Sequence, residues 1–338
     1  MIGRVCVTGG SGFIGSHMVE TFLDAGIKVR IVDNLRTGRR EFVPTHASGN
    51  IWKTGPEFFH ADITTDHDTL LTAFDGCDWV IHLAANPDAR GERRGVRFNI
   101  DQNILGTANI LDAMQHVGTT RILYASSASI YGNTTQTPTP EDFAMVPQAS
   151  FYGASKLAGE GLIGAYSEMY GFTGILGRWV HILGERYLHG HIIDFLRKLR
   201  RDPRTLHILG DGRQAKSGLH ARNLTDGLLL AMQHHNLDDG RCEAYNFGGD
   251  TLFTVTESAH LICEVLEERA VDWFQDRTES ILFTYSGRPN GGWVGDNPSL
   301  ILDSTKAREV LGWEPTMTVP DAIRCTVEYL TSDVCTYL

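Results

Sequence analysis

Thr8-Gly9-Gly10-Ser11-Gly12-Phe13-Ile14-Gly15 is the stretch of this sequence that indicates its fold. Glycines at positions 9, 12 and 15 follow an apolar run typical of a strand and precede a segment typical of a helix. In such a turn the first glycine permits a tight bend, the second lets the main chain approach a diphosphate, and the third allows the helix to pack closely on the strand. The helix N-terminus then faces the phosphates. The pattern predicts a dinucleotide-binding unit.

Short apolar strands alternate with amphipathic helices on both sides of this turn, which is typical of a parallel, doubly wound sheet. Expected strands cover residues 4–8, 28–32, 57–60, 79–82, 121–125 and 173–180, and expected helices cover 13–25, 69–74, 102–116 and 152–170. After about residue 180 the segments become shorter and more mixed. The sequence therefore predicts an α/β, Rossmann-type fold with a smaller, partly interleaved C-terminal lobe. We assign 1–180 to the cofactor-binding domain and 181–338 mainly to the substrate-binding lobe, with some segments returning to the first domain.

Composition narrows the possible partners of the 338-residue chain. Its net charge is −11 and it has no long basic run, which argues against nucleic acid. The stretch RKLRR (197–201) is read as the solvated face of a helix, with local anion binding as the alternative. Six scattered cysteines show no metal-ligand spacing, so no metal site is expected. No signal segment and no run of about 18 apolar residues is visible, so we expect a cytoplasmic protein without a membrane partner.

Asp33 ends the second expected strand, 18 positions after Gly15. A carboxylate there can accept hydrogen bonds from the adenosine ribose and would repel a 2′-phosphate, which favours NAD over NADP. Arginines at 36, 39 and 40 keep NADP as an alternative. Asp62, after the third strand, is placed to meet the adenine, although a cap of a helix or turn would also explain it.

Tyr152 and Lys156 stand four positions apart on an expected helix and therefore share one of its faces. A free tyrosine has a pKa near 10. A nearby ammonium and an oxidised nicotinamide ring would favour the phenolate, which could then take a proton from a hydroxyl while hydride leaves the carbon. Such a pair also occurs by chance as surface packing. A serine-rich segment, 125–132 (ASSASIYG), follows a strand end, where ligands of parallel sheets bind, although a polar turn would look the same.

Together these residues resemble the extended short-chain dehydrogenase/reductase family of sugar-nucleotide epimerases and dehydratases. The resemblance runs from about residue 3 to 330 and is closest to UDP-glucose/UDP-galactose 4-epimerase-like enzymes. It rests on TGGSGFIGSH (8–17), VDNL (32–35), HADI (60–63), VIHLAAN (80–86), ASSASIYG (125–132), YGASKLAGE (152–160), LGDGRQAKSGLH (209–220) and GWVGDNP (292–298). It implies tightly bound, recycled NAD, a UDP-sugar substrate, and a homodimer formed through helices at 101–116 and 152–170.

The resemblance also implies the site residues. Ser127 lies 25 positions before Tyr152, the family's distance for the catalytic serine, and completes a catalytic set of Ser127, Tyr152 and Lys156. The implied cofactor-binding residues are Gly9, Gly12, Phe13, Ile14, Gly15, Asp33, Asn34, Asp62, Ile63, Leu83, Ala84, Ala85, Asn103, Ala125, Tyr152, Lys156 and Val180. The implied substrate-binding residues are Asn86, Ser127, Ser129, Tyr152, His181, Lys216, Arg288 and Asp296.

The family's 4,6-dehydratases carry an Asp-Glu pair where this chain has Ala128-Ser129, and its decarboxylating members have a Glu in this region. The missing acid or base favours epimerisation at C4′ through a transient 4-keto sugar. A dehydratase, a ketoreductase and an epimerase of a modified sugar are the alternatives. A non-catalytic dinucleotide sensor is disfavoured because Tyr152 and Lys156 are both present.

Four positions depart from the family pattern. His181 replaces an Asn that touches the diphosphate in the family, and Gly218 replaces a Tyr. Arg222-Asn223 replaces an acidic pair. The family also has an arginine for the diphosphate close to the position of Trp293, whereas the nearest arginine here is Arg288. We interpret these changes as marks of a different sugar or of a different fate of the intermediate.

Overall fold

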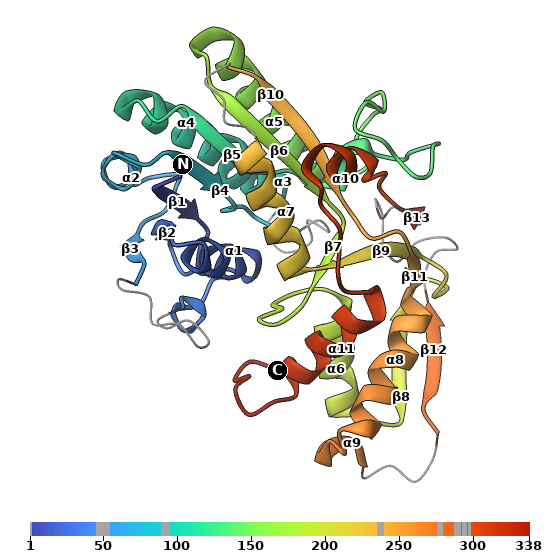
Figure 1. The fold of residues 1–338 in the computed structure, drawn as a ribbon. Helices are drawn as coiled ribbons and strands as arrows, with labels where there is room; N and C mark the ends of the chain where they lie inside the picture. Colours follow the sequence, from blue (N-terminus) through green and yellow to red (C-terminus); the bar gives the residue numbers. More distant parts are fainter. Residues whose placement is uncertain are drawn as a thin grey trace.

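Seven parallel strands form the central sheet, in the order β3-β2-β1-β4-β5-β6-β10 (Figure 1). The structure is a computed structural model that describes residues 2–44, 55–88, 95–234, 240–275, 280–286, 292, 296 and 299–338. The strands are β1 (Arg4–Thr8), β2 (Lys28–Asp33), β3 (Glu57–His60), β4 (Trp79–His82), β5 (Arg121–Ala125), β6 (Thr173–Trp179) and β10 (Cys242–Phe247). The order reverses between β1 and β4, and ligands of doubly wound sheets bind at such a switch point.

Helices cover both faces of this sheet, because alternate side chains of a strand point in opposite directions. On β1, Val5 and Val7 join one apolar core, whereas Cys6 joins another. The helices of the first core are α1 (Phe13–Asp24) and α7 (Ala221–His234), and those of the second are α2 (His67–Phe74), α4 (Gly106–Val117) and α5 (Phe151–Tyr170). Burial on both faces explains why the strands read as continuous apolar runs.

A second group of elements lies beside this sheet and contributes to the first core (Figure 1). Its strands are β7 (His181–Leu183), β9 (Ala215–His220), β11 (Leu252–Thr254) and β13 (Ser299–Leu300) in one small sheet, and β8 (Thr205–Leu209) with β12 (Leu282–Ser286) in another. Its helices are α6 (His191–Arg201), α8 (Val255–Glu268), α9 (Asp272–Gln275), α10 (Thr305–Leu311) and α11 (Val319–Leu330). Strand β10 comes after β9 in the chain but pairs with β6 in the large sheet.

The expected elements of the first half are confirmed, several of them to the residue. Strands β1, β3, β4 and β5 have the expected bounds. The helix expected over 102–116 is instead a succession of α3 (Gly95–Asn99), a π-helical segment (Ile100–Leu105) and α4. Two 3-10 segments, Arg40–Phe42 and Ala128–Tyr131, lie in the turns after β2 and β5.

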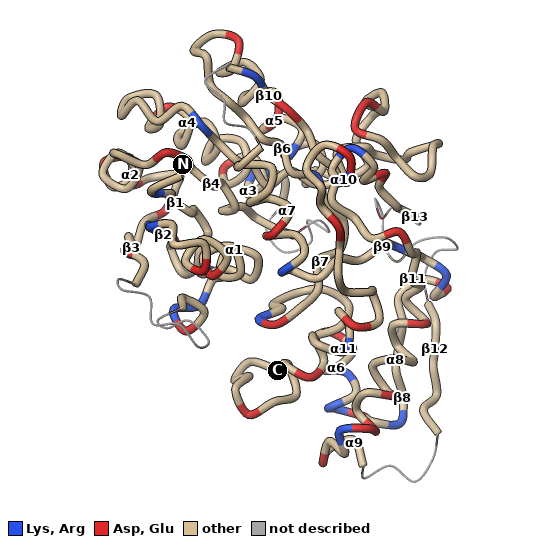
Figure 2. Tube along the Cα trace, viewed as in Figure 1, with Lys and Arg blue, Asp and Glu red and all other residues tan. Residues whose placement is uncertain are grey.

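Acidic and basic residues are interspersed over both parts of the molecule (Figure 2). Among the helices that the structure describes, none is long and apolar enough to cross a membrane.

Candidate active site

The glycine turn between β1 and α1 requires glycine for steric reasons. Gly9 has φ +72°, and a Cβ there would lie 2.8 Å from the main-chain nitrogen of Ala84. A Cβ on Gly15 would lie 2.0 Å from the carbonyl oxygen of Gly9. Helix α1 begins after Gly12, which has no side chain to cap the amides of the first turn. Those amides are available to an anion at the helix N-terminus.

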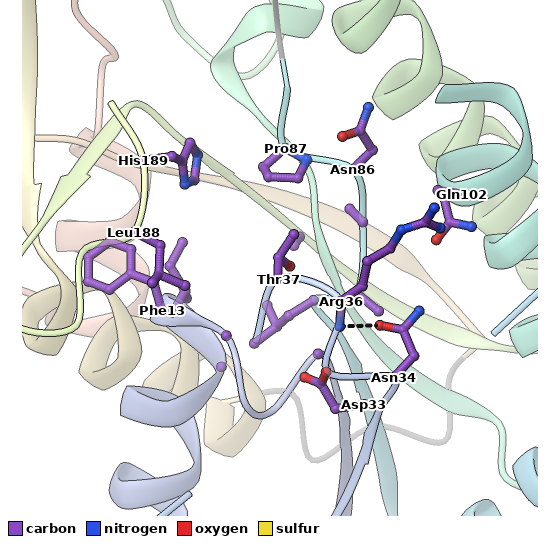
Figure 3. A pocket seen from close by; sticks show the side chains of 18 of the residues that line it. Phe13, Asp33, Asn34, Arg36, Thr37, Asn86, Pro87, Gln102, Leu188 and His189 are labelled. Atoms are coloured by element: carbon purple, nitrogen blue, oxygen red, sulfur yellow. Dashed lines mark hydrogen bonds between the residues drawn. The ribbon is translucent and has the colours of Figure 1, made fainter. Parts of the chain in front are cut away.

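A cavity of about 440 Å³ opens beside this turn (Figure 3). Most of the predicted cofactor residues line it, namely Gly9, Gly12, Phe13, Ile14, Gly15, Asp33, Asn34, Ile63, Leu83, Ala84, Ala85, Ala125, Tyr152 and Lys156, together with Asn86. Asp62, Asn103 and Val180 are outside the lining, as are Ser127, Ser129, His181, Lys216 and Asp296. A volume of several hundred cubic ångströms is typical of a site for a small molecule or cofactor.

Asp33, at the end of β2, is buried at the cavity wall. Its carboxylate accepts hydrogen bonds from the main-chain nitrogens of Ser11 (2.9 Å) and Leu35 (2.8 Å). Burial raises the pKa of Asp33, and these two hydrogen bonds oppose that rise. Of the described residues in the lining, Asp33 is the only carboxylate, and the lining contains the three arginines Arg36, Arg39 and Arg197.

The arginines after β2 are held on aromatic rings. The guanidinium carbon of Arg36 lies 4.7 Å from the ring centre of Phe98, and that of Arg39 lies 4.5 Å from the ring centre of Tyr337. Arg40 stacks in the same way on Phe58, at 3.9 Å. Such cation–π contacts fix the positions of side chains that would otherwise be flexible.

Asp62 contacts Asn34 and does not itself line the cavity. Its Oδ2 accepts a hydrogen bond of 2.8 Å from Asn34 Nδ2, and its Oδ1 accepts hydrogen bonds from the main-chain nitrogen and the hydroxyl of Thr64. Asp62 therefore orders the turn after β3 and orients Asn34, which lines the cavity.

Tyr152 and Lys156 lie together near the first turn of α5, whose N-cap Ser150 accepts a hydrogen bond from Gly153. The Nζ atom of Lys156 lies 5.9 Å from the ring centre of Tyr152 and 5.0 Å from that of Tyr124. Burial raises the pKa of Tyr152 to about 12, although a hydrogen bond with Ser127 lowers it. Burial lowers the pKa of Lys156 to about 7. A positive charge brought into the cavity by a ligand would favour the phenolate.

Ser127 and Ser129 are hydrogen-bonded to each other beside Tyr152. The hydroxyl of Ser127 accepts hydrogen bonds from the main-chain nitrogen of Ser129 (3.1 Å) and from its hydroxyl (2.9 Å). The Ser127 hydroxyl therefore keeps its own proton to donate, and its hydrogen bond with Tyr152 places that proton beside the phenol oxygen. Ala128, between them, is buried.

A buried polar network supports this end of the cavity from behind. Glu160, two turns after Tyr152 on α5, accepts hydrogen bonds from Ser126 and from both the Nε and Nη2 atoms of Arg178. Arg178 also donates to the hydroxyl of Tyr131 (2.9 Å). Because these residues lie on α5, on β6 and in the segment after β5, the network fixes the helix that carries Tyr152 relative to the strand ends.

The predicted substrate side is only partly assembled around this cavity. His181 and Gly218 are paired in register between β7 and β9. His181 Nε2 lies 2.8 Å from the hydroxyl of Tyr187, and a Cβ on Gly218 would meet Val319 and Leu183 in the core. Lys216 forms an ion pair of 2.6 Å with Asp296. Arg288 lies outside the described residues.

Arg222 and Asn223 do not reach the cavity. Arg222 forms an ion pair of 2.9 Å with Asp24 at the end of α1. Asn223 donates a hydrogen bond to Thr316 and accepts one from the main-chain nitrogen of Met317. The departure at 222–223 is thus explained by packing between α7 and its neighbours.

Glu185, His220 and Cys325 bring potential metal ligands within 4.8 Å of one another. However, the Nδ1 atom of His220 accepts a hydrogen bond from the main-chain nitrogen of Arg222, so a neutral ring carries its proton on Nε2. That Nε2 lies 3.3 Å from Glu185, whose pKa is lowered to about 2 by this contact. A metal would need the lone pair of Nε2, so the arrangement favours a direct contact between the side chains of His220 and Glu185.

Sequence reasoning missed several lining residues, some inside the recognised motifs and others in segments without a local pattern. They are Val32, Thr37, Ala61, Pro87, Phe98, Gln102, Ser126, Trp179, Leu188, His189, Arg197 and Tyr337. Leu188 and His189 lie beside Phe13 on one side of the cavity, opposite Asn34, Arg36 and Gln102 (Figure 3). The three arginines of the basic stretch 197–201 are exposed as expected, but Arg197 also reaches the cavity and donates to the main-chain oxygen of Tyr337.

The sheet order and the glycine turn define a Rossmann-type fold with a cavity suited to a dinucleotide, beside which Lys156 is buried and Tyr152 is half-buried. Residues 5–248 match the model of the NAD dependent epimerase/dehydratase family, so the chain belongs to that family and uses NAD.

Its relatives cover nearly the whole chain. A putative UDP-glucose 4-epimerase from Methanocaldococcus jannaschii is 29% identical over 96% of this chain and 98% of its own length. A crystal structure of a UDP-galactose 4-epimerase has 33% identity and a TM-score of 0.81, covering 97% of this chain and 98% of the other. The NAD complex of Thermus thermophilus UDP-glucose 4-epimerase has 27% identity and a TM-score of 0.79, covering 98% and 99%. UDP-glucuronic acid decarboxylases are also among the relatives.

Proposed function

We propose that this protein is an NDP-sugar 4-epimerase, with a UDP-hexose as substrate, acting through a transient 4-keto sugar. The observation that carries the proposal is that Tyr152, hydrogen-bonded to Ser127, and Lys156 line a cavity with no carboxylate next to them in its described lining. Asp33 is the only carboxylate in the described lining, and it belongs to the ribose end. Ala128 and Ser129 occupy the segment where a dehydratase needs an acid and a base, and neither side chain can serve in these roles at neutral pH.

The residues would divide the chemistry as follows. Tyr152, as phenolate, takes the proton of the C4′ hydroxyl and later returns it. Ser127 donates a hydrogen bond to the same sugar oxygen, and Lys156 favours the phenolate by its charge. NAD, when bound, accepts the hydride and gives it back. Gly9, Gly12 and Asp33 would hold its diphosphate and adenosine ribose, which fits a tight turn whose packing leaves no room for a Cβ at Gly9 or Gly15.

A panel of NDP-sugars incubated with the purified protein, without added NAD, tests the reaction. We expect a C4′ epimer detectable by NMR, with unchanged mass and no net change in nicotinamide absorbance. A product lighter by one water would indicate a dehydratase, and net oxidation of added NAD(P)H would indicate a ketoreductase. Either result would overturn the proposal.

Tyr152→Phe tests the catalytic assignment. Loss of the proton acceptor should reduce kcat by roughly 10²–10⁴-fold, the usual contribution of general acid–base catalysis. NAD content should stay close to normal, because the phenyl ring remains. Tyr170→Phe, on the exposed end of the same helix, is the control and should be neutral. Full activity of Tyr152→Phe would remove Tyr152 from the mechanism.

We also propose a homodimer formed through the α3–α4 segment and α5. Val96, Ile100 and Leu105 are more than 40% exposed, at spacings of four and five residues along a helix whose middle is π-helical. Phe151 on the adjoining α5 is 60% exposed. A double Ile100→Glu and Leu105→Glu variant should elute as a monomer in light scattering, whereas Leu282→Glu, also apolar and exposed, should not change the mass. An unchanged mass for the double variant would exclude this face.

A further inference from the structure

One wall of the cofactor cavity comes from the part of the chain farthest in sequence from the glycine turn. Tyr337 and Arg197 line the cavity together with Arg39. In Figure 1 the chain leaves α11 and ends beside α6, the helix that carries Arg197. These contacts do not belong to the glycine turn, to Asp33 or to the Tyr152–Lys156 pair.

The ring of Tyr337 holds Arg39 against the cavity. The guanidinium of Arg39 lies over this ring at 4.5 Å, and the ring of Phe42 meets it edge-on at 5.8 Å. The main-chain nitrogen of Arg39 donates to the carbonyl oxygen of Ser11, within the glycine turn (2.9 Å). Tyr337 is thus packed on a segment that is itself tied to the cofactor-binding turn.

Helix α6 holds the last segment of the chain, residues 332–338 (the tail), in place. Arg197 Nη2 donates to the main-chain oxygen of Tyr337 (3.0 Å), and Arg200 Nη1 donates to that of Leu338 (2.8 Å). Charged donors make hydrogen bonds stronger than neutral ones do. The two arginines therefore join α6, the tail and Arg39 into one wall.

The charge of this wall suits the anionic cofactor. The described lining has three arginines and one carboxylate, in a chain whose net charge is −11. A dinucleotide carries a diphosphate with two negative charges, so Arg39 and Arg197 would be attracted to it across a partly dehydrated cavity. Since each arginine contacts Tyr337, the position of both depends on the tail.

We propose that residues 332–338, clamped between α6 and Arg39, form a latch that retains NAD in the cavity. Tyr337 is a positioning residue that acts through Arg39 and Arg197. By thermodynamic linkage, a tail that favours bound NAD must itself be stabilised when NAD binds. The latch concerns cofactor binding only, so it stands whichever sugar nucleotide the enzyme uses.

The first experiment follows release of NAD from the holoenzyme by ultrafiltration after dilution, without any sugar nucleotide. Tyr337→Ala and Arg197→Ala should each release NAD roughly ten times faster, and the Kd of Arg197→Ala should depend less on salt. Tyr337→Phe keeps the stacked ring and should behave as the wild type. Thr336→Ala in the tail and Arg201→Ala on α6 are matched controls, because both are exposed and lie outside the lining.

The second experiment uses the unaltered chain and does not depend on how the variants fold. Amide hydrogen exchange of residues 332–338 should slow several-fold when NAD is added, while exchange on the exposed face of α8 should not change. Wild-type release rates in both Tyr337→Ala and Arg197→Ala would overturn the latch. Unchanged exchange of 332–338 on NAD binding would overturn it as well.

Discussion

Charged side chains behind the catalytic end of the cavity are buried, whereas those that join α8 to α11 lie at the surface. The side chains of Arg178 and Glu160 are each 7% exposed and form a bidentate pair. Arg324 of α11 forms a similar fork with Glu264 and Glu268 of α8, but these side chains are 31%, 54% and 53% exposed. Both clusters pair an arginine with carboxylates, but the Arg178 cluster is buried in the protein and the Arg324 cluster is exposed to water.

The difference shows where this molecule tolerates change. A charge that loses its partner at the surface is rehydrated, so surface pairs contribute little. A charge that loses its partner in the interior cannot be rehydrated, so the protein is strongly destabilised. The region that binds the cofactor and carries Tyr152 should therefore respond strongly to single substitutions, and the α8–α11 region weakly.

The largest effect should come from Gly15→Ala. The new Cβ would lie 2.0 Å from the carbonyl oxygen of Gly9, so the turn must open. We expect a loss of more than about 4 kcal/mol in unfolding free energy together with loss of NAD, measured by urea titration and by nucleotide content.

Gly161→Ala is the control for that change. Gly161 is an exposed position in the middle of α5 with open space around it, so alanine should stabilise the protein by about 0.5–1 kcal/mol. A Gly15→Ala protein that retained both NAD and stability would contradict the steric argument.

Arg178→Ala and Arg324→Ala compare the two clusters directly. Arg178→Ala leaves the carboxylate of Glu160 buried without its partner and should cost about 3–5 kcal/mol. Arg324→Ala should cost about 1 kcal/mol or less. Both are measured by urea unfolding at the same pH. Equal costs would mean that burial does not separate the clusters.

An effect smaller than those of Gly15→Ala and Arg178→Ala should appear in the pH dependence of stability. His82 is buried and lies between the hydroxyls of Thr8 (2.9 Å) and Thr107 (3.0 Å). Burial lowers its pKa from 6.5 to about 3, so between these values the unfolded chain binds a proton that the folded chain does not. Stability should therefore fall as pH decreases, by about 1–2 kcal/mol between roughly pH 7 and pH 5.

A His82→Asn variant should show a flatter pH profile over that window, even if it is less stable overall. His260→Asn, at an exposed position on α8, should keep the slope of the wild type. If the slope of His82→Asn were unchanged, the acid sensitivity would have to come from other buried groups, such as His17, whose pKa is also lowered to about 3 by burial.

The two regions also differ in how far local sequence describes them. Strands β1 to β5 are short, mainly apolar runs, and their bounds could be read almost to the residue. Strands β7 to β9 and β11 to β13 are equally short or shorter, but several of them carry polar residues, such as His207 in β8 and Lys216 and Ser217 in β9. Strands of this kind leave no continuous apolar run to detect. The proposed division at residue 180 remains a prediction, with β10 as a segment that returns to the first sheet.

The sequence by itself determined the parallel sheet, the glycine turn and the shared helix face of Tyr152 and Lys156, because each depends on local sterics or on helical periodicity. Ser127 was added by the family resemblance. Only the tertiary structure decided that Tyr337 and Arg197 join the cavity, that Gly218 and Arg222 lie away from it, and that Arg178 is paired inside while Arg324 is paired outside. Those facts depend on which distant surfaces meet and how much water they exclude, and no local pattern records either.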